Sequence, residues 1–173
     1  SHLLMIRPAR FAFNEQTAVN NAFQVKEERD DIPERALQEF DALVQQLRAH
    51  AIEVTVLEDN PEPHTPDAVF PNNWISFQEE QTICLYPMYA PNRRQERRPA
   101  ILESISRHFP VKNRVDLTHY ERENKFLEGT GSLVLDREKR FAEAGLSPRT
   151  DQTVLDDFFS RFGDRPCVFH AVD

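Results

Sequence analysis

The sequence has few cysteines and few glycines for its length. Two cysteines, Cys84 and Cys167, and four glycines occur among 173 residues. Two cysteines so far apart exclude a disulfide framework and favour a reducing compartment. Neither a Walker-type nor a dinucleotide-binding glycine loop is present, so we expect no nucleotide cofactor, and nothing else in the sequence indicates a cofactor.

Basic residues are outnumbered as well. Twenty-one Lys and Arg stand against 29 Asp and Glu, which gives a formal net charge of −8. Phosphate contacts need a basic surface, so we expect no nucleic-acid partner. No apolar run reaches the roughly 20 residues of a membrane helix, so we expect no membrane partner. The first residues also lack the pattern of a signal peptide, and we expect a soluble, cytoplasmic protein.

The histidines do not form a metal-binding pattern. Five of them show no spacing typical of ligands: His50, His64, His108, His119 and His170. Isolated histidines are usually surface residues or satisfied core residues. We therefore expect no metal site, and a metalloenzyme is the least supported class of function.

What the chain does have is a recurring order of predicted strands and helices. Thirteen Phe indicate a packed core, and the length suits one domain. Strands are predicted at 3–6 (buried on both faces), 52–56, 69–77, 82–86, 111–117, 131–136, 140–144 and 167–172. Helices are predicted from an N-cap at Asp31 to about His50, from Pro99 to Phe109, and from an N-cap at Asp151 to Gly163. Residues 14–21 are predicted to form a loop.

This order suggests repeated α/β units. A strand–strand–helix–strand sequence recurs at a period of roughly 60 residues, which is typical of a radial or layered array. We therefore expect residues 1–173 to form part of a single domain, with approximate modules 1–60, 61–120 and 121–173.

Residues 67–77 combine core-forming side chains with polar groups. Asp67, Asn72 and Asn73 interrupt an apolar run that includes Phe70 and Trp74. Buried carboxylates and amides cost free energy unless they are hydrogen-bonded, so these residues are expected to have partners or a ligand. The alternative is a simple turn at the end of a strand.

Two further stretches could carry chemistry. In residues 86–96 a Pro-rich turn follows a strand and presents Arg93 and Arg94, whose planar forks suit a ligand carboxylate. The alternative is a solvated basic patch, because Arg97 and Arg98 continue the run. In residues 126–135, Glu128 precedes a Gly-Thr-Gly turn that lets the backbone approach a ligand. The alternative is an ordinary surface turn.

In their order, these segments resemble the guanidine-modifying (pentein) superfamily. The resemblance rests on Asp67-x-x-Phe70 leading to Asn73, on residues 90–96, on Leu127-Glu128-Gly and on Ser147-Pro-Arg-Thr-Asp151. The superfamily includes dimethylarginine dimethylaminohydrolases, arginine deiminases and amidinotransferases. The start of the chain and residues 66–77 are most similar to its arginine deiminase-related branch, the citrulline utilization hydrolases.

The resemblance implies a five-bladed α/β propeller of ββαβ modules, of which about three lie in this chain. It also implies a C–N hydrolase acting on ureido or guanidino groups of amino acids by Cys-His-Glu covalent catalysis. By position, Glu128 matches the carboxylate that orients the histidine, and Asp67 matches a residue that grips substrate nitrogens. Asn72 and Asn73 occupy the second part of that grip. Arg93, less certainly Arg94, and Arg149 match the arginines that bind the substrate carboxylate.

The chain departs from the superfamily pattern in two ways. Asn73 stands where dimethylarginine hydrolases carry a second Asp, and a neutral amide suits a ureido group better than a cationic guanidinium. The family's His and Cys are missing, because His170 is expected inside a strand while Cys84 and Cys167 are expected to be core thiols with raised pKa. We therefore expect an N-terminal portion, inactive alone, that pairs with a remaining C-terminal segment or self-associates. The alternatives are a catalytically incomplete binding or assembly domain and an amidinotransferase.

Overall fold

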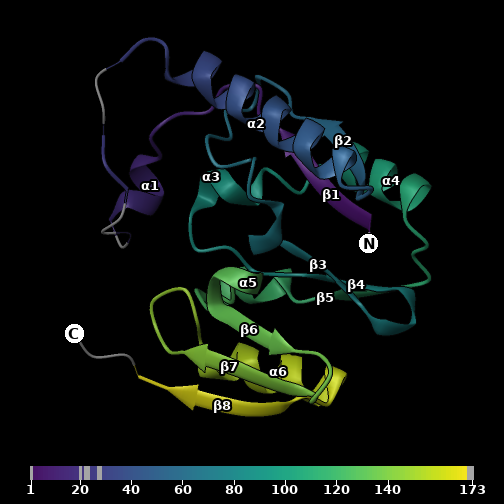
Figure 1. The fold of residues 1–173 in the computed structure, drawn as a ribbon. Coiled ribbons are helices and arrows are strands. Elements are labelled where there is room, and N and C mark those ends of the chain that lie inside the picture. Colours follow the sequence, from purple (N-terminus) through teal and green to yellow (C-terminus); the bar gives the residue numbers. More distant parts are fainter. Residues whose placement is uncertain (1, 20, 22–23, 27–28, 171–173) are drawn as a thin grey trace. The chain divides into compact units, whose positions relative to one another are not determined.

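The computed structural model describes residues 2–19, 21, 24–26 and 29–170. Contacts divide the chain into two compact units. Unit 1 comprises Ser1–Pro71 and Ala90–Phe109, and unit 2 comprises Asn72–Tyr89 and Pro110–Asp173. The helices and strands confirm the predicted mixed α/β class (Figure 1).

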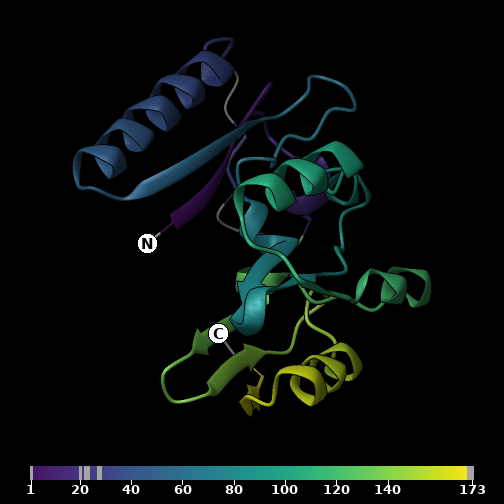
Figure 2. The same cartoon turned by 90° about the vertical axis from the view of Figure 1, so that its right-hand side faces the viewer.

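Unit 1 is built on a strand–helix–strand motif. β1 (His2–Arg7) pairs in parallel with β2 (Glu53–Glu58), and α2 (Ile32–Ala49) connects them. Figures 1 and 2 both show α2 lying along this strand pair. The helical spacing of apolar residues on α2 places one face of the helix in a core. The buried members of that core are Phe40, Val44 and Val54.

The predicted burial of residues 3–6 on both faces is wrong. Leu3 is 39% exposed, and Ile6 is the buried residue of β1. The reason is the small size of this sheet, which has two strands in the described part of the chain.

The start of α2 agrees with the prediction in position but not in chemistry. Asp31 is the N-cap residue and Pro33 lies in the first turn. However, the Asp31 side chain makes no capping hydrogen bond, because its two oxygens accept from Arg29 at 2.9 and 2.8 Å.

The prediction of a loop at 14–21 is wrong in part, because this segment contains a short helix, α1 (Glu15–Ala18). Asn14 caps it, since its side-chain oxygen accepts from the Gln16 backbone N–H at 3.1 Å. Asparagine is a favoured N-cap residue, so a polar stretch can begin a helical turn. Residue 20 of this stretch lies outside the described residues.

Unit 2 contains two three-stranded sheets. The strands of the first are, in order, β3 (Ile75–Gln78), β4 (Thr82–Leu85) and β5 (Asn113–Asp116). Those of the second are β6 (Leu133–Asp136), β7 (Phe141–Gly145) and β8 (Arg165–Phe169). In each sheet the first pair is antiparallel and the second is parallel.

The strand–strand–helix–strand order therefore occurs twice within the part of the chain that the structure describes. α4 (Pro99–His108) precedes β5, and α6 (Gln152–Phe162) precedes β8. The first predicted module has one strand before its helix among the described residues. Short helical turns complete the elements: η1 (Pro71–Asn73), η2 (Glu79–Gln81), α3 (Pro91–Arg94), η3 (Thr118–Glu123) and α5 (Gly129–Ser132).

Two predicted strands are shorter or shifted. The strand predicted at 69–77 starts at Ile75, because residues 71–73 form η1, and Phe70 is 47% exposed. The closing strand is β8, so His170 lies after the strand and is exposed. Residues 171 and 172 of the predicted strand lie outside the described residues.

One face of the β6–β7–β8 sheet packs against α6 (Figure 2). The opposite face carries Val134 and Cys167, which share a register position with Glu143. Val134 is 67% exposed, and Cys167 is exposed too. The prediction that Cys167 is a core thiol is therefore wrong, because alternation along β8 turns it away from α6.

In the described part of the chain, no helix is both long enough and apolar enough to cross a bilayer.

The cap of α6 gives a test of these helix starts. The Asp151 side chain accepts from the Thr153 backbone N–H at 2.8 Å. We expect Asp151→Ala to lower the free energy of unfolding by about 1 kcal/mol. Urea unfolding followed by far-UV circular dichroism, which reports the helices of both units, measures the loss for each variant. Asp31→Ala is the matched control and should lose less, because Asp31 makes no capping bond; equal losses would contradict the assignment.

Candidate functional site

The predicted site residues of unit 2 lie at one end of its sheets. β3 begins after Asn73, and its antiparallel partner β4 ends a few residues before Tyr89. β6 begins after Ser132, and its antiparallel partner β7 ends shortly before Arg149. Since antiparallel neighbours run in opposite directions, the first residue of one strand and the last residue of the next lie at the same end of the sheet. The turns at 78–82 and 136–140 lie at the opposite end of each sheet.

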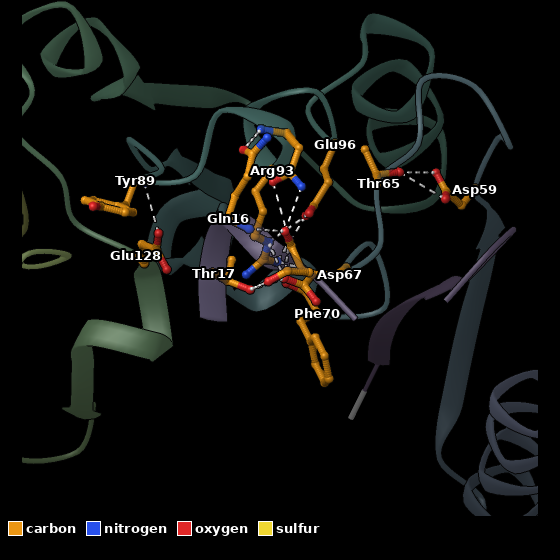
Figure 3. A network of polar contacts seen from close by, with 12 residues as sticks. Gln16, Thr17, Asp59, Thr65, Asp67, Phe70, Tyr89, Arg93, Glu96 and Glu128 are labelled. Atoms are coloured by element: carbon orange, nitrogen blue, oxygen red, sulfur yellow. Dashed lines mark hydrogen bonds and ion pairs between the residues drawn. The ribbon is translucent and has the colours of Figure 1, made fainter. Parts of the chain in front are cut away.

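Glu128 is the most buried carboxylate of this group. Its side chain is 1% exposed, and its Oε1 accepts from the Tyr89 backbone N–H at 3.0 Å (Figure 3). Its Oε2 lies 3.5 Å from Nη1 of Arg149. A buried carboxylate needs such partners, because desolvation otherwise makes the charged form costly. Glu128 is thus held in a fixed position by a backbone donor and a cation.

Ser132 organises the loop around Glu128. Its Oγ accepts from the Glu128 backbone N–H at 3.0 Å and from the Thr150 hydroxyl at 2.8 Å. It donates to the Arg149 carbonyl at 3.0 Å. One hydroxyl therefore links the segment that carries Glu128 to the segment that carries Arg149.

The two asparagines pack against the Gly-Thr-Gly turn. Asn72 donates from Nδ2 to the Thr130 hydroxyl at 2.8 Å. A Cβ added to Gly129 would lie 2.3 Å from the Asn72 carbonyl oxygen, and one added to Gly131 would lie 2.3 Å from Nδ2 of Asn73. The glycines therefore leave room for the asparagines to approach this turn closely. The approach of a ligand to the turn stays a prediction.

Unit 1 carries a second group, which is centred on Asp67. The residue is 8% exposed. Its Oδ2 accepts from Nδ2 of Asn14 at 2.7 Å and from the Thr17 hydroxyl at 3.2 Å, and it lies 3.9 Å from Nε of Arg93 (Figure 3). Within the described part of the chain, no hydrogen bond to this carboxylate ends on Oδ1. Asp67 therefore keeps one oxygen that can accept a bond from a ligand N–H.

Arg93 is a buried member of this group. The residue is 3% exposed, and it donates from Nε and Nη2 to the two oxygens of Glu96 at 2.8 and 3.1 Å. Nη2 also donates to the carbonyls of Phe70 and Asp67 at 2.9 and 3.3 Å. Arg93 therefore braces the 67–70 segment. Its contact with a ligand carboxylate stays a prediction, as does that of Arg94, which is partly buried.

Asn14 and Thr17 are site residues that the sequence analysis missed. Asn14 is 1% exposed and is linked to Asn92, whose Nδ2 donates to its Oδ1 at 2.8 Å. The Asn92 backbone N–H donates to Gln16 Oε1 at 2.9 Å. The polar composition of residues 14–21 was the available signal, but it equally suited a solvated loop.

The cysteines offer no nucleophile to either group. Burial raises the pKa of the Cys84 thiol to about 12, as predicted for a core thiol. Cys167 lies on the exposed face of the β6–β8 sheet. Among the described residues, no three His, Cys, Asp or Glu side chains are grouped as metal ligands.

The six predicted residues thus fall into two groups. Asp67 and Arg93 meet in unit 1, while Asn72, Asn73, Glu128 and Arg149 surround one turn in unit 2. Their convergence on one substrate stays a prediction, as do their individual roles.

A family model described as "N,N dimethylarginine dimethylhydrolase, eukaryotic" matches residues 7–173. No curated protein matches the chain.

Several solved structures share the fold. The N-terminal domain of ArgZ bound to substrate, described as an arginine dihydrolase in cyanobacteria, aligns with a TM-score of 0.73 at 18% identity, over 99% of this chain and 58% of that one. DDAH from Pseudomonas aeruginosa complexed with citrulline gives a TM-score of 0.68 at 16% identity, over 100% and 62%. AgrE with ornithine and NAD+ gives 0.72 at 20% identity, over 99% and 23%. The chain therefore spans less than two thirds of the length of each.

The Gly-Thr-Gly turn provides a test of this geometry. Gly129 has a φ of +43° and its added Cβ would meet backbone at 2.3 Å. We expect Gly129→Ala to lower the free energy of unfolding by about 1–3 kcal/mol, measured by urea unfolding. Gly145→Ala is the matched control, because its Cβ would meet the Phe169 ring at an ordinary 3.5 Å. If the two variants were equally stable, the close packing of Asn72 on this turn would be wrong.

Proposed function

Because the chain belongs to the eukaryotic N,N dimethylarginine dimethylhydrolase family, and thereby to the guanidine-modifying superfamily, we propose that it carries the substrate grip of a C–N hydrolase. The substrate is an amino acid with a ureido or guanidino group, of the citrulline or arginine type. Cleavage proceeds by Cys-His-Glu covalent catalysis, with the Cys and His supplied by residues outside this chain. The protein titles above name arginine dihydrolase, citrulline and ornithine, which supports this substrate class.

The observation that carries the proposal is the orientation of Asp67. Its Oδ2 is held by Asn14 and Thr17, so the carboxylate is fixed before a ligand arrives. Its Oδ1 remains available to accept an N–H from a ureido or guanidino nitrogen. Because the Asp67 side chain is 12% exposed, a bond to its carboxylate is stronger than one formed in water.

Glu128 supports the catalytic half of the proposal. Its carboxylate is anchored by the Tyr89 backbone N–H, so it can accept a further bond from a histidine ring N–H and fix the orientation of that ring. The histidine then removes the thiol proton, the thiolate attacks the ureido or amidino carbon, and the same histidine protonates the departing nitrogen. The histidine next removes a proton from water, which attacks the covalent intermediate, releases the product and restores the cysteine. Arg149, 3.5 Å from Glu128, would bind the substrate carboxylate.

Asn73 favours a neutral substrate. An amide can donate to a ureido oxygen and accept from a ureido N–H, and it adds no charge for a guanidinium. We therefore place citrulline-like compounds ahead of arginine as substrates, as in the arginine deiminase-related branch.

One substitution should shift this preference between citrulline and arginine. In the complete protein we expect kcat/KM for L-citrulline to exceed that for L-arginine. Asn73→Asp should shift the ratio toward arginine about tenfold, because a carboxylate forms charge-assisted bonds with a guanidinium. Asn72→Asp adds the same charge on an exposed side chain bonded to Thr130, and its shift should be smaller. Faster arginine hydrolysis by the unaltered protein would contradict the proposal.

Two other functions use the same residues differently. A binding or assembly domain would bind the amino acid with no turnover in the complete protein. An amidinotransferase would pass the amidino group to an amine rather than to water. Ammonia or amine release without an added acceptor separates the hydrolase from both.

We also propose that the two ββαβ repeats are blades of a five-bladed propeller. The uncovered face of the β6–β7–β8 sheet supports this, since Val134 and Phe169 are 67% and 46% exposed there. Exposed apolar sheet faces and unpaired edges invite association. A remaining segment of the same fold would cover this face, and without it another copy of the chain would do so.

The 173-residue chain should therefore self-associate when it is alone. We expect size-exclusion chromatography with light scattering to give a mass above that of the 20.2 kDa monomer. Val134→Asp should reduce association, because a charge on the sheet face opposes its burial. Val25→Asp, at a 75% exposed position in unit 1, is the control. A monodisperse monomer of the unaltered chain would contradict the prediction.

A further inference from the structure

Glu96 forms the most enclosed ion pair of unit 1. Its two oxygens accept from Nε and Nη2 of Arg93 at 2.8 and 3.1 Å, and the two side chains are 2% and 4% exposed. This bidentate geometry fixes the plane of the guanidinium. The sequence analysis assigned no role to Glu96.

Arg93 stands between two carboxylates of unequal distance. Glu96 lies at hydrogen-bond distance, whereas Oδ2 of Asp67 lies 3.9 Å from the same Nε (Figure 3). The guanidinium also holds the carbonyls of Asp67 and Phe70. A change in the charge of Glu96 therefore changes how strongly Arg93 attracts the Asp67 carboxylate.

In the described part of the chain, charged groups near Glu96 besides Arg93 include Asp67, Asp59 and Arg98. Asp59 pairs with Arg98 at 2.5 Å and accepts from the Thr65 hydroxyl at 3.1 Å. Burial raises the pKa of Glu96 to about 7, the attraction of Arg93 opposes this rise, and the charges of Asp67 and Asp59 add to it. Glu96 is therefore the acidic group of this cluster that titrates near neutral pH.

We propose that Glu96 is a positioning residue for Asp67, and this rests on the proposed role of Asp67 in gripping substrate nitrogens. Ionised Glu96 neutralises Arg93 and leaves the Asp67 carboxylate to its bonds with Asn14 and Thr17, with Oδ1 presented to the ligand. Protonated Glu96 no longer neutralises Arg93, so the guanidinium draws Asp67 toward itself and away from the ligand. Ligand affinity therefore increases as pH rises through neutrality.

The test compares Glu96→Gln with Glu103→Gln, an exposed carboxylate that pairs with Arg107 on the surface of α4. Calorimetry measures the affinity of the complete protein for L-citrulline from about pH 5.5 to 8.5. We expect the unaltered protein and Glu103→Gln to bind about three- to tenfold more tightly at the high end. The glutamine of Glu96→Gln keeps the shape of the glutamate but is neutral at every pH. The affinity of this variant for L-citrulline should therefore be low and should not rise across neutrality. If the affinity of Glu96→Gln rose with pH as it does in the unaltered protein, the proposal would be overturned.

A second measurement needs no ligand. The 13C resonance of the Asp67 carboxyl should show a titration step near pH 7 in the unaltered protein and none in Glu96→Gln. Absence of this step in the unaltered protein would overturn the positioning role even if citrulline binds. If citrulline failed to bind at every pH while the step was present, the proposed function would fail and the coupling of Glu96 to Asp67 would stand.

Stability checks that the variant is folded. The pKa of Glu96 rises from its ordinary 4.5 to about 7 on folding, so the folded state binds more protons between these values. The stability that Glu96 contributes should therefore fall as pH rises across this window, so the free energy of unfolding should change more negatively with pH in the unaltered protein than in Glu96→Gln.

Discussion

The constraint on which the rest of this structure depends is the burial of carboxylates. Asp59, Asp67, Glu96 and Glu128 are each less than a tenth exposed. A carboxylate in such a place is tolerated when donors surround it, and each of these has them: an arginine, a hydroxyl, an amide or a backbone N–H. Satisfying these groups fixes the loops that carry them, so the loops become as well defined as the strands.

Those loops are the natural place for a binding site. The sheets of unit 2 are short, and the polar segments lie where their strands begin or end. Ser132 and the two glycines of the turn let backbone, asparagine and carboxylate approach one another closely. In unit 1 the arrangement is different, because a short helix and an arginine turn hold Asp67 from separate parts of the sequence. Both groups surround a buried carboxylate with hydrogen-bond donors and one arginine.

Arg93 shows how one residue type can be misjudged from pattern alone. An arginine in a polar, Pro-rich turn suggests a solvent-facing clamp, and the sequence pattern offered a basic patch as the alternative. The structure gives it a third position, buried and committed to Glu96 and to two backbone carbonyls. The charge of a side chain can be read from the sequence, but the bonds of Arg93 to backbone carbonyls 23 and 26 residues away cannot, because they depend on tertiary packing.

The sequence alone determined the α/β class, the order of most strands and helices, the helix starts at Asp31 and Asp151 and the candidate acids and amides. These follow from local periodicity and local hydrogen bonding, which need few distant contacts. Only the tertiary structure decided that Cys167 and Phe70 are exposed, that residues 15–18 are helical, and that Asn14, Thr17 and Glu96 surround Asp67 and Arg93. The physical reason is that burial and charge pairing depend on which distant segments pack together, and a linear pattern of residue types does not specify that packing.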